Sequence, residues 1–138
     1  MRELLFRGKR TDTGEWIESS GLHSRLGKSY IIGISKTGRS HDLWEVDTNS
    51  AGQYTGVDDK NGTNIFEGDI LQFDYIGKNL GVKGLGTVIF ENGQFGVKWG
   101  WHKEFVSLVG FANTTITVIG NIHDNPELLK EGADNDNV

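Results

Sequence analysis

The residues with chemistry to offer are four histidines and one pair of close carboxylates, and their spacing matches no familiar catalytic or metal site. No two histidines stand four residues apart, and none lies beside an acid in a zinc motif; they are His23, His41, His102 and His123. Glu67 and Asp69 are neighbours, but the glycine between them indicates a turn that enters a strand. Cysteine and the Gly-x-Ser-x-Gly nucleophile elbow are both missing. We therefore expect no enzyme, no metal site and no cofactor.

Two segments that we expect to be loops match ligand-binding motifs only in part. An EF-hand loop has its glycine sixth and acids first and twelfth, whereas Gly62 as sixth residue makes Val57 first and Gly68 twelfth. The acidic segment 58–64 is therefore interpreted as a turn. The glycine-rich segment Gly77–Gly86 lacks the Gly-Lys-Ser/Thr ending of a phosphate loop, and no helix signal follows it. We expect a flexible loop there.

Segment 98–103 stands out because its tryptophans are interleaved with cations, a pattern that suits stacking on bases or gripping a peptide. Strand alternation puts the two tryptophans on one face, so core packing is the simpler interpretation and a binding surface is the alternative. Lys83, in the glycine-rich loop that precedes the same hairpin, is added to this segment. The candidate partner surface consists of Trp99, Trp101, His102, Lys103 and Lys83.

Charge is distributed unevenly along a chain whose net charge is −5. An acidic chain repels nucleic acid at long range. Cations are nevertheless concentrated near the start, where Arg7, Lys9 and Arg10 define a candidate basic edge, with a solvated edge as the simpler interpretation. No apolar run approaches the ~18 residues that span a bilayer, and the first ten residues do not resemble a signal peptide. We expect a soluble, cytoplasmic protein.

Composition and patterning favour an all-β protein. Glycine contributes 20 of 138 residues and proline only one, which suits tight turns between short strands. Alternation in Ile70–Tyr75 puts Leu71 and Phe73 on one face and Gln72 on the other, as in a half-buried strand. Further strands are expected at 4–6, 16–17, 30–34, 43–46, 105–109 and 115–122.

The clearest local signal is a β-hairpin. Asn92-Gly93 predicts a two-residue type I′ turn, because both residues tolerate positive φ. Such a turn sets Phe90 opposite Phe95 and Val88 opposite Val97, and all four side chains then lie on one face.

Only the end of the sequence carries a helix signal. Asn125 is a good capping residue, Pro126 suits the first helical position, and Leu128 and Leu129 follow. The segment has room for one or two turns.

Three segments, taken in order, carry a family resemblance. They are Leu-Phe-Arg-Gly-Lys-Arg with Gly-Glu-Trp in 5–16; Gly-Gln-Tyr-Thr-Gly, Asp-Lys-Asn-Gly and Ile-Phe-Glu-Gly-Asp-Ile in 52–70; and Val-Ile-Gly-Asn-Ile with Asn-Pro-Glu-Leu-Leu in 118–129. Over roughly residues 4–130 the chain resembles the YopX-like proteins of bacteriophages and prophages. The resemblance implies a mainly β protein with an SH3-type small barrel in its C-terminal part and additional N-terminal strands, to which the capping residues add a short C-terminal helical turn.

The resemblance also shapes our functional expectations. It implies that residues 1–51 form strands packed on a barrel of residues 52–130. The polar residues at the end of the sequence predict a disordered tail at 131–138. The resemblance supplies no catalytic residue, and Val57-Asp58 replaces the commoner Leu-Lys, which removes a cation that nucleic acid would use. We expect a phage accessory protein in the cytoplasm of the bacterial host cell. It would be a non-enzymatic interaction module that binds a protein partner or forms a homo-oligomer. We expect it not to bind a membrane. A nucleic-acid-binding small β-barrel, with weak binding, is the alternative.

The candidate partner surface leads to a direct test. Trp101→Ala should weaken self-association, measured by light scattering, or partner binding, measured by pull-down, because tryptophan is a preferred interface anchor. A variant that folds normally and matches the parent in both measurements would place the surface elsewhere. A variant that does not fold would show that Trp101 belongs to the core.

Overall fold

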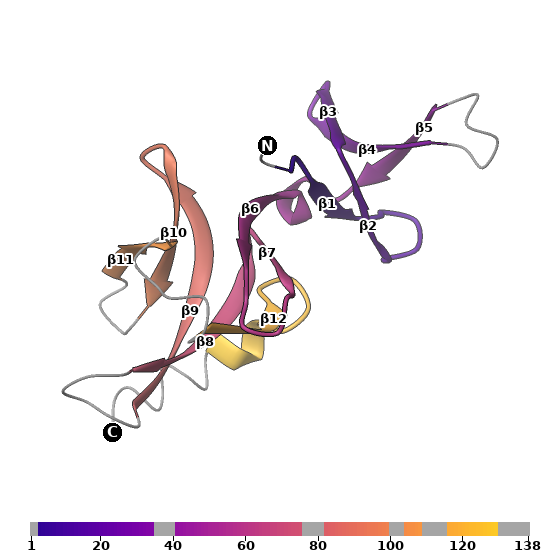
Figure 1. The fold of residues 1–138 in the computed structure, drawn as a ribbon. Coiled ribbons are helices and arrows are strands. Elements are labelled where there is room, and N and C mark those ends of the chain that lie inside the picture. The colour runs from indigo at the N-terminus through magenta and orange to yellow at the C-terminus, as the bar shows by residue number, and fades with distance from the viewer. Residues whose placement is uncertain (1–2, 35–40, 76–81, 100–103, 109–115, 130–138) are drawn as a thin grey trace. The chain divides into compact units, whose positions relative to one another are not determined.

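The computed structural model describes residues 3–34, 41–75, 82–99, 104–108 and 116–129 (Figure 1). These residues form twelve strands in three antiparallel sheets. The expectation of a mainly β protein is therefore confirmed. The chain divides into two compact units, Met1–Gly56 and Val57–Val138, called unit 1 and unit 2 below.

Unit 1 contains two small sheets. In the first, β1 (Phe6–Lys9) pairs with β2 (Trp16–Ser19) and with the start of β6 (Gly52–Asp58). The second sheet has the order β3 (Gly21–Arg25), β4 (Lys28–Ile34) and β5 (His41–Val46). A 3₁₀ turn, η1 (Thr48–Ser50), follows it. β6 ends at Asp58, beyond the boundary of unit 1, and β7 (Asn64–Phe66) is a short strand of unit 2.

The two sheets of unit 1 are joined where β1 and β5 end. Ile31 and Val46 are buried, and Gly8 on β1 lies so close to Val46 that an added Cβ would be 2.7 Å from its Cγ2. The N–H of Asp47 donates to the carbonyl of Lys9 at 2.8 Å, and further bonds run from Thr11 N–H to the Glu45 carbonyl and from Lys9 N–H to Ser50 Oγ. These bonds fix the charged residues that follow β1 beside those that end β5.

Unit 2 is built on a five-stranded sheet with the order β11-β10-β9-β8-β12. The strands are β11 (Glu104–Ser107), β10 (Gln94–Trp99), β9 (Val82–Glu91), β8 (Asp69–Tyr75) and β12 (Ile116–Asn121). The buried core consists of Ile65, Leu71, Phe73, Val88, Val97, Leu108 and Ile116. Within the described residues this order is open, so the SH3-type barrel stays an expectation. A helical turn at 126–129 agrees with the capping signal before it.

The expected hairpin is confirmed in type and register. Asn92 and Gly93 both have positive φ, 53° and 79°. Phe90 pairs with Phe95 and Val88 with Val97, and the two phenylalanine rings meet edge to face with centroids 4.9 Å apart. Both valines are buried in the core. The turn residues and the apolar pattern therefore select the same register.

The expectation of a loop over Gly77–Gly86 is wrong from Val82 onward, because β9 begins there. Gly84 is opposite Phe73 and the phenylalanine ring fills the place of its missing side chain, so this glycine serves close packing within a strand. Residues 76–81 lie outside the described part of the chain. Two strands with little apolar character, β3 and β6, were not expected from the sequence.

A second difference concerns β8. Ile70 is buried together with Leu71, so the strand is covered on both faces where it begins and is not half-buried throughout. The turn before it is closed by Asp69, whose carboxylate accepts the Phe66 N–H at 2.8 Å.

The Asn92-Gly93 turn gives a quantitative expectation for stability. Gly93→Val should lower the free energy of unfolding by about 1–3 kcal/mol, because a β-branched residue fits positive φ badly. Gly93→Asn is the control, since asparagine tolerates this conformation and should cost less. Urea denaturation measures both; an unchanged midpoint for Gly93→Val would contradict the turn type.

Candidate functional site

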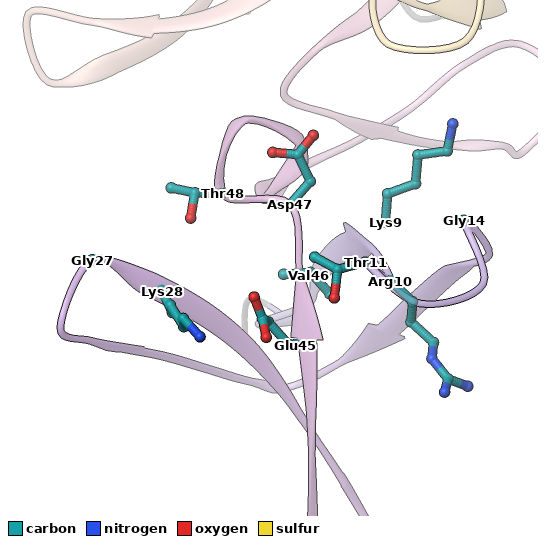
Figure 2. Close-up of a pocket in the computed structure, with 10 residues that line it drawn as sticks. All are labelled: Lys9, Arg10, Thr11, Gly14, Gly27, Lys28, Glu45, Val46, Asp47 and Thr48. Carbon is teal, nitrogen blue, oxygen red and sulfur yellow. The ribbon is translucent and has the colours of Figure 1, made fainter.

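An open pocket of about 510 Å³ lies in unit 1, between the end of β1, the β3–β4 turn and the end of β5 (Figure 2). Half of the residues that line it are charged; the lining comprises Lys9, Arg10, Thr11, Gly14, Gly27, Lys28, Glu45, Val46, Asp47 and Thr48. Three cations and two carboxylates therefore share one small site. This mixture suits a ligand or partner segment that carries both charges better than it suits a polyanion.

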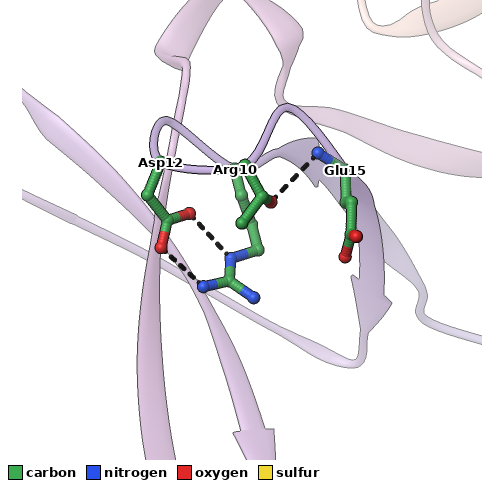
Figure 3. Close-up of polar contacts among 4 residues, drawn as sticks. Arg10, Asp12 and Glu15 are labelled. Atoms are coloured by element: carbon green, nitrogen blue, oxygen red, sulfur yellow. Dashed lines mark hydrogen bonds and ion pairs between the residues drawn. The ribbon is translucent and has the colours of Figure 1, made fainter.

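Arg10 is held firmly at one side of this pocket. Its Nε and Nη2 donate to the two carboxylate oxygens of Asp12 at 2.9 and 2.6 Å (Figure 3). Its guanidinium carbon also lies 4.2 Å from the centroid of the Trp44 ring. The hydrogen bonds from Arg10 hold the pKa of Asp12 below its usual value. Arg10 is therefore already engaged by an acid and an aromatic face of its own unit.

The other two residues of the candidate basic edge flank Trp16. The Arg7 guanidinium carbon is 4.7 Å and the Lys9 Nζ 6.0 Å from that ring centroid. Lys9 is directly opposite Trp16 in the β1–β2 pairing, and alternation puts Arg7 on the same face. Lys9 and Arg10 are adjacent in sequence and extend in opposite directions, as Figure 2 shows. The three cations thus do not form one continuous patch.

The candidate partner surface lies mostly beyond the described residues. Trp101, His102 and Lys103 are outside them. Trp99 ends β10 opposite Gly86, and Lys83 is on β9 opposite Asp74. Whether these side chains form a binding surface stays a prediction.

The acidic segment 58–64 is organised by one carboxylate that takes its hydrogen bonds from the backbone. Asp59 is 4% exposed, and its Oδ1 accepts the N–H groups of Asn61 and Thr63 at 2.8 and 2.9 Å. Its Oδ2 accepts the N–H of Val118 on β12 at 2.9 Å. The carboxylate thereby closes the turn and attaches it to a strand far away in sequence, which supports the interpretation of the segment as a turn.

The same hydrogen bonds set the acidity of Asp59. Burial acts to raise the pKa of this carboxyl, but the N–H groups of Val118, Thr63 and Asn61 and the charge of Lys60 outweigh it. The pKa is therefore lower than usual, and the group stays ionised at neutral pH. Among the described residues there is no group of three or more histidines and carboxylates that could hold a metal ion.

Reasoning from the sequence missed the exposed leucines of the small β3-β4-β5 sheet. Leu22, Leu26 and Leu43 are on β3, in the β3–β4 turn and on β5, and all three are exposed. Leu26-Gly27 forms a two-residue turn with positive φ at both positions. The available signal was Gly27 between two strand-forming segments, but leucine is not a turn residue and concealed it.

The fold and this pocket define a mainly β protein with two small units and a polar, mixed-charge recess in the first. The family model described as YopX protein matches residues 5–130, and the chain therefore belongs to the YopX family. Its structure is similar to the crystal structure of protein EF1440 from Enterococcus faecalis, with 28% sequence identity and a TM-score of 0.53. That similarity covers 94% of this chain and 99% of the other. A comparison with curated proteins finds no match.

None of the helices in the described part of the chain combines the length and the apolar character needed to span a bilayer.

Asp59 predicts a pH-dependent contribution to stability. Its pKa is depressed in the folded state, so the stabilisation is present above the unfolded pKa and is lost as pH falls through the lower, folded value. Asp59→Asn should lower the free energy of unfolding by about 1–3 kcal/mol at pH 7, because the charged acceptor of three N–H groups is lost. The difference from the parent should shrink below about pH 4.

Urea denaturation at pH 7 and at pH 3 measures this difference. Glu127→Gln changes an exposed acid of the same unit in the same chemical way and should have little effect. A deficit for Asp59→Asn that is equally large at both pH values would contradict the electrostatic explanation.

Proposed function

We propose that this YopX family member is a non-enzymatic protein-interaction module of a phage or prophage, acting in the cytoplasm of the bacterial host cell. The observation that carries the proposal is the exposure of leucines on the three-stranded sheet of unit 1. Leu22, Leu26 and Leu43 are 39%, 91% and 56% exposed. Leu43 lies on the face that points away from buried Ile31, Leu22 is paired with Ile31 and lies on the other face, and Leu26 is in the turn. Exposed apolar side chains that adjoin one another are typical of surfaces that bind another protein, and here they are Leu43 with its outer-face neighbours and Leu26 at the tip.

The outer face of this sheet has the composition of a contact surface. Ile31 and Val46 point to the buried face, so Ile32 and Leu43, which are directly opposite each other, point to the other face. Tyr30 lies on the same outer face, two residues before Ile32. Gly21 is opposite Ile32 on β3, so β3 adds no side chain over this isoleucine. Tyr30 and Ile32 are partly exposed and Leu43 is exposed; these three residues are called the outer strip below.

The buried acids of unit 2 support a non-enzymatic role. Asp59 and Asp69 both accept backbone N–H groups, and these bonds shape turns. In unit 1, Arg10 and Asp12 satisfy each other. These polar groups already have hydrogen-bond partners within their own unit.

Nucleic-acid binding is the second candidate, favoured by the three cations Lys9, Arg10 and Lys28 that line one pocket. Glu45 and Asp47 line the same pocket, and the net charge is −5. We therefore expect at most non-specific affinity, with a dissociation constant in the range of about 10⁻⁴ to 10⁻⁶ M, falling steeply with salt.

The two candidates can be separated with one pair of variants. Leu43→Ser should weaken the complex with a protein partner, recovered with the tagged chain from its host cells, by about tenfold, because half-exposed leucine contributes apolar contact area. Leu4→Ser is the matched control, since Leu4 is 50% exposed but lies outside the sheet. Titration of the purified partner, and light scattering for self-association, measure the effect.

Two results would contradict the proposal. The proposal would be contradicted if the parent chain bound neither another protein nor a second copy of itself. A sub-micromolar dissociation constant for DNA or RNA in physiological salt, weakened by Lys9→Glu, would favour the second candidate.

A further inference from the structure

The chain contains two hairpin turns with nearly the same backbone geometry and very different residues. In the β9–β10 hairpin, Asn92 and Gly93 have φ values of 53° and 79°. In the β3–β4 hairpin, Leu26 and Gly27 have φ values of 51° and 78°. Both are two-residue turns of the type I′ kind, which favour asparagine, aspartate or glycine at the first position. The β9–β10 hairpin thus provides an internal reference for the β3–β4 hairpin.

Leucine is a poor choice for the first position of this turn. Positive φ brings its Cβ close to the backbone, a strain that asparagine tolerates much better. Leu26 is also 91% exposed, so packing within the chain does not compensate for the strain or for the contact with water. A residue held in an unfavourable conformation and kept in solvent indicates a role outside its own fold.

The flanking residues add a second unfavourable feature. Arg25 and Lys28 are directly opposite each other at the base of the turn, and like charges in this position destabilise a hairpin. In the other hairpin the equivalent pair is Glu91 and Gln94, and Glu91 lies 3.7 Å from Lys98. The β3–β4 tip therefore combines one exposed apolar residue, Leu26, with two flanking cations, Arg25 and Lys28.

We propose that the β3–β4 tip, residues Arg25–Lys28, is the anchor of the interaction surface and inserts Leu26 into an apolar pocket of a partner protein with an acidic rim. This inference rests on the proposed function, since it names how the module would bind. Carboxylates on the rim would pair with Arg25 and Lys28 and relieve their mutual repulsion. Burial of Leu26 would remove its apolar surface from water.

A protein pocket fits this tip better than an anionic membrane does. One leucine side chain is a small membrane anchor, because stable attachment needs two independent signals. The net charge of −5 also opposes approach to an anionic surface. Half of the residues that line the pocket of unit 1 are charged, and three of them are cations, so it fits a leucine flanked by two cations on a second copy badly.

The first test concerns the isolated protein. Leu26→Asn should raise the melting temperature by a few degrees, because asparagine suits positive φ. Asn92→Leu, the reciprocal change in the reference hairpin, should lower it. A fall in melting temperature with Leu26→Asn would show that leucine stabilises the turn, and the argument for an external role would be lost.

The second test concerns the partner. A diazirine-bearing leucine analogue at position 26 should crosslink to one protein in host cells, whereas the same analogue at position 92 should not. The purified partner should bind Leu26→Asn at least tenfold more weakly than the parent, and Arg25→Gln with Lys28→Gln should reduce the salt dependence of binding. Leu26→Met should retain most of the affinity, because it keeps the apolar volume.

The outcomes separate this inference from the proposed function. Normal binding of a protein partner by Leu26→Asn would overturn the anchor while leaving the interaction module intact. Absence of any protein complex with the parent chain would overturn both. Binding to phosphatidylglycerol vesicles that is lost with Leu26→Asn would assign the tip to a membrane and overturn the protein pocket.

Discussion

The buried carboxylate of Asp59 is the interaction on which unit 2 depends most. It accepts two N–H groups within its own turn and a third from Val118, so it fixes a local turn and a long-range strand contact at once. The backbone N–H of Lys60 adds a bond to the carbonyl of Ile116, a core residue of the same strand. β12 is thereby held at the edge of the sheet beside β8, where it completes the core.

Polar groups elsewhere in the chain are used in a similar way. Asp69 closes the turn before β8, and Arg10 is shared between Asp12 and the Trp44 ring. A charged group that is already satisfied within its own unit has less to offer a ligand than its residue type suggests. The features of unit 1 that the fold does not explain are the outer strip and the β3–β4 tip, with its exposed leucine and its facing pair of cations. This division between satisfied charge and exposed apolar surface is the basis of the proposed interaction role.

Local sequence predicts local structure well where residue type and pattern agree. The Asn92-Gly93 turn and the alternation around it select one register, and the structure has that register. Pro126 after Asn125 likewise marked the short helix. The signal was weak for β3 and β6, which carry few apolar residues and gain their hydrogen bonds from neighbouring strands. It was misleading for Gly84, because the sequence does not distinguish a strand glycine that packs against an aromatic ring from a glycine in a loop.

The sequence by itself determined the mainly β class, the main hairpin, the family and the residues of the basic edge. Only the tertiary structure decided what those residues do. Arg7 and Lys9 lie over Trp16 because β2 is paired with β1, and no spacing rule encodes that partnership. The interaction surface was hidden for the same physical reason: whether a leucine is buried depends on which elements pack over it. Turn geometry and exposure single out Leu26, and both are properties of the folded chain.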